Sequence, residues 1–170
     1  LHETTNLEKA DEFYQKALQA DPHNTDALGF SALNKIHLKD FDKAYEQIEH
    51  ALEHQANNGF MHFIAGKIRF MQEKYEDAKM FFVKSYELEK THDCENMLGL
   101  CYFELGNYEQ ANNIFKHLLE ENPLNVNLLL SSARCYEKLN DKDSALATLD
   151  KIVDAFPECE EAQEMIREIS

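Results

Sequence analysis

Two histidines one helical turn apart have the clearest capacity for chemistry in this sequence. His50 and His54 enclose a run that fits the H-x-x-E-H pattern, in which two imidazoles hold the zinc ion of one group of peptidases. Imidazoles at i and i+4 share a helix face and can bind zinc together. However, Ala51 and Leu52 also fit an internal helical repeat, and the sequence offers no third ligand. We therefore interpret the pair as exposed and without metal. An adventitious metal site and a metal-dependent hydrolase are the alternatives.

The other motifs that could carry catalysis are incomplete. Gly59 and Gly66 are spaced too widely for a phosphate-binding loop, and Ile68 stands where that loop needs Ser or Thr. Adjacent carboxylates such as Glu120 and Glu121 are typical of a solvated helix surface. We expect no catalytic residue, no cofactor and no metal site, so the sequence does not predict an enzyme.

The four cysteines resemble packed thiols more than a disulfide framework. Cys94, Cys101, Cys135 and Cys159 show no C-x-x-C spacing, and a small secreted disulfide scaffold would be richer in Cys. We expect reduced side chains that pack as small hydrophobic groups, with Cys159 the most exposed. A cytoplasmic location is the matching expectation.

Composition and charge narrow the fold and the partners. The 170 residues include only 5 Gly and 3 Pro, and 20 Leu and 16 Ala stand against 3 Val, which favours helices and excludes an all-β fold. The net charge of −15 would repel nucleic-acid phosphates and anionic membrane surfaces. No run approaches the ~18 apolar residues of a membrane span. We expect a protein or peptide partner, no nucleic acid and no membrane insertion.

An internal repeat sets the architecture. Five alanines recur at intervals of 33 or 34 residues: Ala10, Ala44, Ala78, Ala111 and Ala145. Four residues after each alanine stands a larger side chain, in order Tyr14, Ile48, Phe82, Phe115 and Leu149. Small residues on facing helices let two backbones approach closely, so we expect Gly66 to meet Ala78 and Gly99 to meet Ala111.

The repeat resembles the tetratricopeptide repeat, a 34-residue helix-turn-helix unit. The clearest copy spans residues 92–125 and carries Leu98-Gly99, Tyr102, Gly106-Asn107-Tyr108, Ala111, Phe115 and Pro123. The resemblance implies an all-α, right-handed superhelical solenoid of antiparallel helix pairs. The expected solenoid contains about four full units, an N-terminal half unit and a C-terminal capping helix. The units fall at about 1–24 (partial), 25–58, 59–91, 92–125 and 126–159, with the cap at 160–170.

The helices of this single solenoid domain follow from the repeat. First helices are expected at 25–38, 59–72, 93–105 and 126–139. Second helices are expected at 7–20, 41–54, 75–89, 108–121 and 142–155, and the capping helix at 160–169. Leu1 would fall in the last turn of a first helix that is otherwise absent. We therefore expect a fragment of a longer protein whose open end leaves Phe13 or Tyr14 partly uncovered.

The resemblance also implies a concave peptide-binding groove along the first helices. The family's groove positions correspond here to Phe30, Leu33, Phe60, Phe63, Lys67, Met97, Leu100 and Arg134. Lys67 and Arg134 are expected to pair with Glu104 and Glu137 nearby, or with an acidic group of a ligand. One subclass grips a partner's C-terminal carboxylate with Lys, Arg and Asn side chains. Its pattern is not matched at the corresponding positions, so that ligand is not expected.

These residues predict a non-enzymatic interaction module, an adaptor or scaffold. It would bind an apolar or amphipathic peptide segment of a partner, with Phe and Met side chains supplying most of the affinity. The alternative is a self-associating structural scaffold, a homo-oligomer formed through a solenoid end or the groove, because an unpaired solenoid edge invites stacking.

Overall fold

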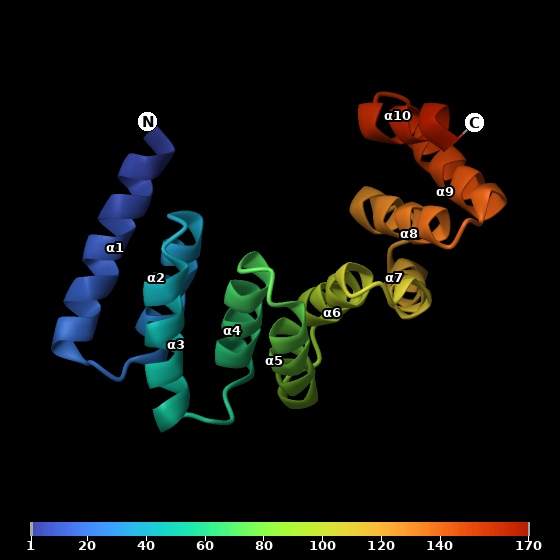
Figure 1. Ribbon diagram of the computed structural model, residues 1–170. Helices are drawn as coiled ribbons and strands as arrows, with labels where there is room; N and C mark the ends of the chain where they lie inside the picture. Colours follow the sequence, from blue (N-terminus) through green and yellow to red (C-terminus); the bar gives the residue numbers. More distant parts are fainter. Residues whose placement is uncertain (1, 170) are drawn as a thin grey trace. The chain divides into compact units, whose positions relative to one another are not determined.

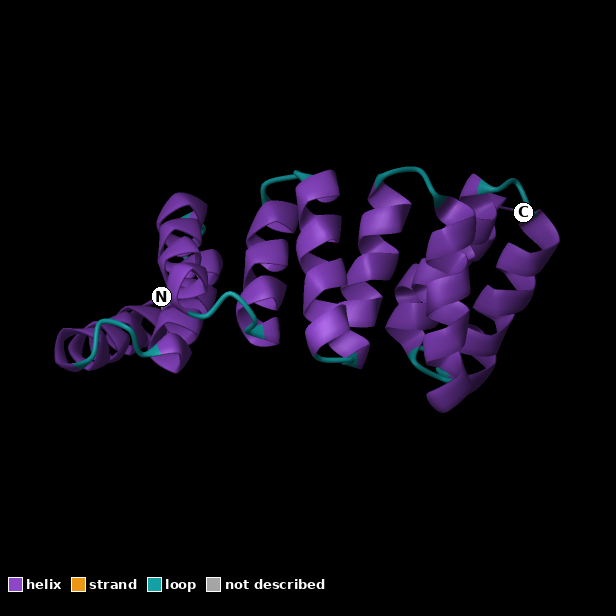
Figure 2. Ribbon diagram, turned by 90° about the horizontal axis from the view of Figure 1, so that it is seen from below, coloured by secondary structure: helices purple, strands orange, loops and turns teal. Residues whose placement is uncertain are grey.

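The computed structural model describes residues 2–169, which form ten α-helices joined by short loops (Figures 1 and 2). In chain order these are α1 (His2–Ala20), α2 (Thr25–His37), α3 (Phe41–His54), α4 (Gly59–Met71), α5 (Tyr75–Leu88), α6 (His92–Glu104), α7 (Tyr108–Glu121), α8 (Val126–Lys138), α9 (Lys142–Ala155) and α10 (Glu160–Ile169). The predicted all-α class is confirmed. Within the described residues, no helix is long and apolar enough to cross a membrane.

The helix boundaries agree with the expected ones to within a residue, with one exception. α1 begins at His2, five residues before the expected start at residue 7. Residues 2–6 contain neither Gly nor Pro, so nothing interrupts the helix there. The expected start of this helix at residue 7 is therefore wrong for residues 2–6. Leu1 itself lies outside the described residues.

The helices divide into two compact units, Leu1–Cys94 and Glu95–Ser170. In the first unit α1 packs against α2, α2 against α3, α3 against α4 and α4 against α5. In the second unit α7 packs against α8, α8 against α9 and α9 against α10. Each unit is thus a stack of sequential helices, and each is described here by itself.

Three of the first helices begin with the same asparagine cap. The side chains of Asn24, Asn58 and Asn125 accept a hydrogen bond from the backbone N–H three residues later. The N···O distances are 2.9, 3.1 and 3.2 Å. Such a cap satisfies a helix N–H that has no partner within the helix, and it typically stabilises the helix by about 1 kcal/mol.

The turn inside each full unit uses one residue in the left-handed region. Lys39, Glu73, Gly106 and Asn140 have φ of 61°, 60°, 79° and 59°. Each stands two residues before a second helix. The N–H of the residue that follows it bonds back to a carbonyl five residues earlier, as from Asp40 to Lys35 at 2.9 Å. This 6→1 bond ends the first helix and reverses the chain.

The repeat alanines form the centre of the core. Ala44, Ala78, Ala111 and Ala145 are completely buried. So are the large residues that follow each of them by four positions, namely Ile48, Phe82, Phe115 and Leu149. In the first repeat, Ala10 and Tyr14 are only half-buried and Phe13 is 76% exposed. The expected uncovered face on α1 is therefore present in the structure.

The helix glycines contact the aromatic residues of this core. A Cβ atom placed on Gly66 would lie 2.7 Å from Cε1 of Phe82, and one on Gly99 would lie 2.6 Å from Cε1 of Phe115. We expected Ala78 and Ala111 to be the residues that meet these glycines. The side chains nearest to the added Cβ atoms are those of Phe82 and Phe115, each one turn after its alanine, because a large ring fills the space that the missing glycine side chain leaves.

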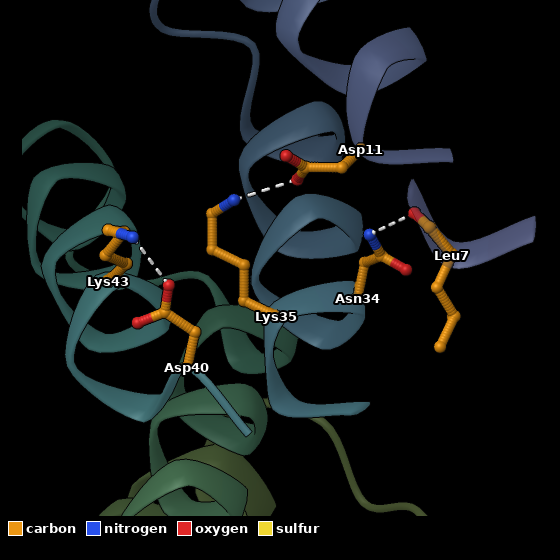
Figure 3. Close-up of polar contacts among 6 residues, drawn as sticks. All are labelled: Leu7, Asp11, Asn34, Lys35, Asp40 and Lys43. Atoms are coloured by element: carbon orange, nitrogen blue, oxygen red, sulfur yellow. Dashed lines mark hydrogen bonds and ion pairs between the residues drawn. The ribbon is translucent and has the colours of Figure 1, made fainter. Parts of the chain in front are cut away.

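Two polar contacts join α1 to α2 (Figure 3). The Asn34 amide donates a hydrogen bond of 2.8 Å to the carbonyl of Leu7. The Lys35 ammonium lies 2.8 Å from the Asp11 carboxylate. These contacts hold the first helix pair together where the apolar packing on α1 is incomplete.

The last helix, α10, has the amphipathic character of a cap. Ala162, Met165 and Ile169 are buried against α9 and its neighbours. Its glutamates at 160, 161, 164 and 168 are exposed. One face of α10 is thus buried and the other exposed, which is the pattern of an amphipathic helix.

Candidate functional site

The eight residues predicted for the groove all reach solvent. Phe30 and Arg134 are exposed, and the other six are half-buried. Phe30, Leu33, Phe60, Phe63 and Lys67 belong to α2 and α4 of the first unit. Met97, Leu100 and Arg134 belong to α6 and α8 of the second.

A row of aromatic rings connects three helices of the first unit. The rings of Tyr14 on α1 and Phe30 on α2 are stacked with centroids 6.2 Å apart. Phe30 is in turn 5.8 Å from Phe60 on α4. Phe30 remains 47% exposed within this row. Tyr14 was not predicted as a groove residue, because its repeat position is a core position in the later units. It joins the row because α1 leaves it only half-buried.

Gly29 allows the α2 and α4 side chains of this row to approach. A Cβ atom there would lie 2.7 Å from Cε of Met61 and 2.9 Å from Cε1 of Phe60. Glycine within a helix costs about 1 kcal/mol relative to alanine. Here it leaves room for the Phe60 ring against α2.

Phe60 and Phe63 line a pocket of about 170 Å³. Its other lining residues are Gly59, Ser85, Glu89, Thr91 and Asp93. The pocket therefore combines two aromatic rings with two carboxylates. Ser85, Glu89 and Thr91 were not predicted as site residues. They come from the end of α5 and the loop after it, where the repeat of the first helices gives no signal.

Lys67 lies one turn beyond Phe63 and interacts with its ring. The Lys67 ammonium is 5.7 Å from the Phe63 centroid, which is within the range of a cation–π contact. The Phe63 ring also packs 5.7 Å from that of Phe82, a fully buried core residue. Contact with a fixed ring on one side and a cation on the other orients Phe63 at the pocket.

In the second unit, Leu100 and Arg134 line a smaller cavity of about 60 Å³, together with Phe103, Glu104, Phe115 and Ser131. The Arg134 guanidinium forms a salt bridge with Glu161 of α10. We expected Glu137 or Glu104 to be its partner. Glu161 was missed because the repeat does not extend into the capping helix. Met97 is half-buried on α6 and lines neither cavity.

A group of three histidines lies elsewhere in the first unit. His23, from the loop between α1 and α2, joins His50 and His54 of α3. The sequence predicted no third ligand for the His50–His54 pair. In the structure this third histidine is His23, which lies in a loop 27 residues before His50. The repeat pattern does not predict which loop residues approach α3.

The thiols are placed as expected for packing groups. Cys94, Cys101 and Cys135 are buried, and Cys159 is half-buried. All four are free. Burial raises the pKa of the Cys135 thiol to about 12, which keeps it protonated and unreactive at neutral pH. The Cys94 thiol donates a hydrogen bond of 3.1 Å to the carbonyl of Phe82.

Comparison with known proteins gives relatives that share this architecture. TPR repeat-containing protein MJ1428 of Methanocaldococcus jannaschii is 27% identical over 165 residues, or 95% of this chain and 29% of that protein. BBSome complex member BBS4 of Bos taurus is 28% identical over 139 residues, or 79% of this chain and 26% of that protein. The chain therefore spans less than a third of either relative.

Solved structures show the same fold. YrrB, described as a TPR protein with an unusual peptide-binding site, has a TM-score of 0.80 at 23% identity, covering 98% of this chain and 87% of that one. A tetratricopeptide repeat protein from Parabacteroides merdae has a TM-score of 0.83 at 18% identity, covering 98% of this chain and 67% of that one.

A family model described as tetratricopeptide repeat matches residues 1–60 and 102–169, which is well over half of the sequence. It agrees with the ten helices, the alanine register and the solved structures of the same fold. The chain belongs to the tetratricopeptide repeat family.

Proposed function

We propose that this tetratricopeptide repeat chain is a non-enzymatic adaptor that binds an apolar or amphipathic peptide segment of a partner protein. The tetratricopeptide repeat is generally a protein–protein interaction fold. The observation that carries the finer proposal is the pocket between Phe60 and Phe63, which adjoins the half-exposed row Tyr14–Phe30–Phe60. Exposed aromatic rings held by a rigid core are the usual anchors of a peptide interface.

The pocket lining suggests the chemistry of the bound segment. The rings of Phe60 and Phe63 favour an aliphatic or aromatic side chain, while Glu89 and Asp93 favour a neighbouring Lys or Arg. The net charge of −15 would also accelerate the approach of a basic peptide. We therefore propose that the ligand carries an apolar anchor flanked by a basic residue.

The structural neighbours support the idea without defining the ligand. YrrB is described as having a peptide-binding site, although at 23% identity the likeness to this chain concerns the fold. The four cysteines form no disulfide bond, which fits a reducing compartment, so a cytoplasmic location is part of the proposal.

The test uses peptides selected from a random displayed library against the whole chain. The dissociation constants of the selected peptides are then measured by fluorescence anisotropy for the wild type, Phe63→Glu and Leu100→Lys. Met80→Glu is the matched control, because Met80 is 64% exposed on α5 and lines neither cavity.

We expect Phe63→Glu to weaken binding at least about tenfold, or 1.4 kcal/mol, because it removes an aromatic ring and places a hydrated charge where the apolar anchor would pack. Met80→Glu should have no effect. Comparison of Phe63→Glu with Leu100→Lys shows whether one unit or both contact the peptide. Selected peptides that bind all variants equally would contradict the proposed groove.

Self-association is the second candidate, and the uncovered face of α1 favours it. Ala10 and Tyr14 are half-buried and Phe13 is 76% exposed, whereas the alanines and large residues equivalent to Ala10 and Tyr14 are fully buried in every later repeat. A second copy could cover this face. Sedimentation velocity over a dilution series tests the idea. An oligomer that Phe13→Glu dissociates would support it, and a monomer at all concentrations would exclude it.

A further inference from the structure

We propose that His23, His50 and His54 form a binding site for a divalent transition-metal ion, with Zn²⁺ as the best match. The proposal departs from the expectation, drawn from the sequence, that the His50–His54 pair is inert. It is independent of the peptide groove, with which the three histidines share no residue.

The site combines a regular helix with a structured loop. His50 and His54 are one turn apart on α3, so their rings leave the same face of the helix. His23 belongs to the turn Asp21-Pro22-His23-Asn24, and its N–H donates to Oδ1 of Asp21 at 3.1 Å. The Asn24 N–H bonds to the Asp21 carbonyl at 3.2 Å, and the Asn24 side chain caps α2. These bonds fix the backbone from which His23 projects.

The three imidazoles are close to one another. The centroid of the His23 ring is 4.1 Å from that of His54 and 5.3 Å from that of His50, and the His50 and His54 centroids are 5.0 Å apart. One nitrogen of each ring lies within 4.8 Å of the others. Tetrahedral zinc with Zn–N bonds of about 2.0–2.1 Å needs nitrogens roughly 3.4 Å apart.

Side-chain rotation can close this difference. His23 and His54 are exposed and His50 is half-buried, so their rings can turn about χ1 and χ2 without disturbing the core. Three ligands from the protein leave a fourth position for water, because the group faces solvent. The site is thus compatible with a three-histidine, one-water coordination shell.

The donor set selects the class of ion. Neutral imidazole suits Zn²⁺, Cu²⁺, Ni²⁺ and Co²⁺, whereas Ca²⁺ and Mg²⁺ prefer oxygen ligands. The chain's net charge of −15 adds a general attraction for cations. Of these metals, zinc accepts tetrahedral coordination most readily, since it has no geometric preference from its d electrons.

A bound ion would connect the α1–α2 loop to α3. The loop carries one ligand and the helix carries two, so the metal would act as a crosslink between consecutive repeats. Because the three ligands come together only in the folded chain, the ion would stabilise the first unit against unfolding.

The test compares the Zn²⁺ affinity of the wild type, which has all three histidines, with that of variants in which only two remain. The whole chain, without a polyhistidine tag and stripped of metal, is titrated with ZnCl₂ by isothermal calorimetry. His23→Ala and His54→Ala are the test variants. The controls are His37→Ala, an exposed histidine at the end of α2, and Cys159→Ser, a partly exposed thiol. Circular dichroism confirms the fold of each variant.

We expect one Zn²⁺ per wild-type chain, and at least a tenfold weaker affinity in both test variants with no change in the controls. Zn²⁺ should raise the melting temperature of the wild type and of His37→Ala but not of His23→Ala. Co²⁺ should give the visible bands of nitrogen–oxygen coordination without thiolate charge transfer. Unchanged affinity in His23→Ala, loss of binding in Cys159→Ser, or a wild type that binds no ion would each overturn the proposal.

Discussion

The ammonium of Lys35 and the carboxylate of Asp11 lie 2.8 Å apart, and together they tie α2 to α1 (Figure 3). The Lys35 side chain is only 10% exposed, and that of Asp11 is 29% exposed. Removal of one partner from such a pair leaves the other charge short of solvent and unpaired, which costs more than the pair itself contributes. The main effect of breaking this ion pair is therefore the cost of leaving the Lys35 ammonium unpaired and poorly hydrated.

We accordingly expect Asp11→Ala to destabilise the α1–α2 pair by about 1–2 kcal/mol. Hydrogen exchange of the α1 and α2 amides measures this local effect. The double variant Asp11→Ala with Lys35→Met should recover most of the loss, because Met replaces the buried stem without a charge. If the α1 and α2 amides of Asp11→Ala exchange at the wild-type rates, the Lys35 ammonium must reach solvent when Asp11 is absent.

Replacement of Glu73 by glycine is expected to stabilise the protein. The Glu73 φ of 60° lies in the left-handed region, which disfavours side chains with a Cβ atom. Glu73→Gly should raise stability by about 0.5–1 kcal/mol in thermal or urea unfolding, after the greater entropy of glycine in the unfolded chain is subtracted.

Gly106 is the matched control for this substitution. It occupies the equivalent turn with φ of 79°, and a Cβ atom there would contact nothing within 4 Å. Gly106→Ala should therefore destabilise the protein through backbone strain alone. Equal stability of both variants and the wild type would mean that the turn relaxes to accommodate either residue.

Gly66 predicts a clash in the core. An added Cβ atom would lie 2.7–2.9 Å from three atoms of the Phe82 ring, which is fully buried. Gly66→Ala should lower the free energy of unfolding by about 1–3 kcal/mol, despite the better helix propensity of alanine. Phe82→Leu in the same chain should restore part of the loss. If the two substitutions change the free energy of unfolding additively in a double-mutant cycle, a clash with Phe82 is not the cause of the loss in Gly66→Ala.

Asp141 predicts a pH dependence. A hydrogen bond from the Ser144 side chain lowers the pKa of Asp141 below its ordinary 3.8. The Ser144 N–H at the start of α9 donates a second hydrogen bond of 3.1 Å to the carboxylate, which lowers the pKa further. A carboxyl group with a lowered pKa stabilises the fold when ionised. Its contribution is therefore present above the pKa of the unfolded chain and is lost as the pH falls through the folded pKa.

Asp141→Ala should consequently melt at a lower temperature than the wild type at pH 7, and the difference should narrow below about pH 3. Asp150→Ala, which removes an exposed acid from the same helix, is the control for net charge. If the difference in melting temperature stays constant from pH 7 to pH 2, the stabilisation by the Asp141 cap does not depend on ionisation of its carboxyl group.

The thiols predict a graded reactivity. Cys159 is half-buried, whereas the other three are buried and the pKa of Cys135 is raised to about 12. In the native protein at pH 8, iodoacetamide should modify Cys159 first, and Cys135 should react only after unfolding. Peptide mass spectrometry at successive times measures the order. Early labelling of Cys135 would indicate frequent opening of α8.

Periodic features of the sequence were sufficient to predict the helices. The recurrence of alanine from Ala44 to Ala145 fixed their order and nearly all their ends, because a repeated unit must bury the same face each time. The same periodicity indicated which helices face each other but not which atoms touch. It therefore paired Gly66 with Ala78 and did not predict that the larger Phe82 ring lies nearest to Gly66.

Residues outside the repeat explain what the sequence did not predict. Glu89 and Thr91 reach the Phe60–Phe63 pocket from the end of α5 and the loop beyond it, and Glu161 reaches Arg134 from the capping helix. His23 likewise projects from a loop. Contacts of this kind depend on how a turn directs its side chains, which the spacing of apolar residues does not encode.

The left-handed turn inside each unit also bears on how the repeats came to differ. The same backbone conformation is occupied by Lys39, Glu73, Gly106 and Asn140, four residues with no side-chain chemistry in common. Main-chain hydrogen bonds hold each turn, so the side chain there is free to vary at the modest cost of a strained φ. Copies of a duplicated segment can thus diverge at this position while the geometry between paired helices is inherited unchanged.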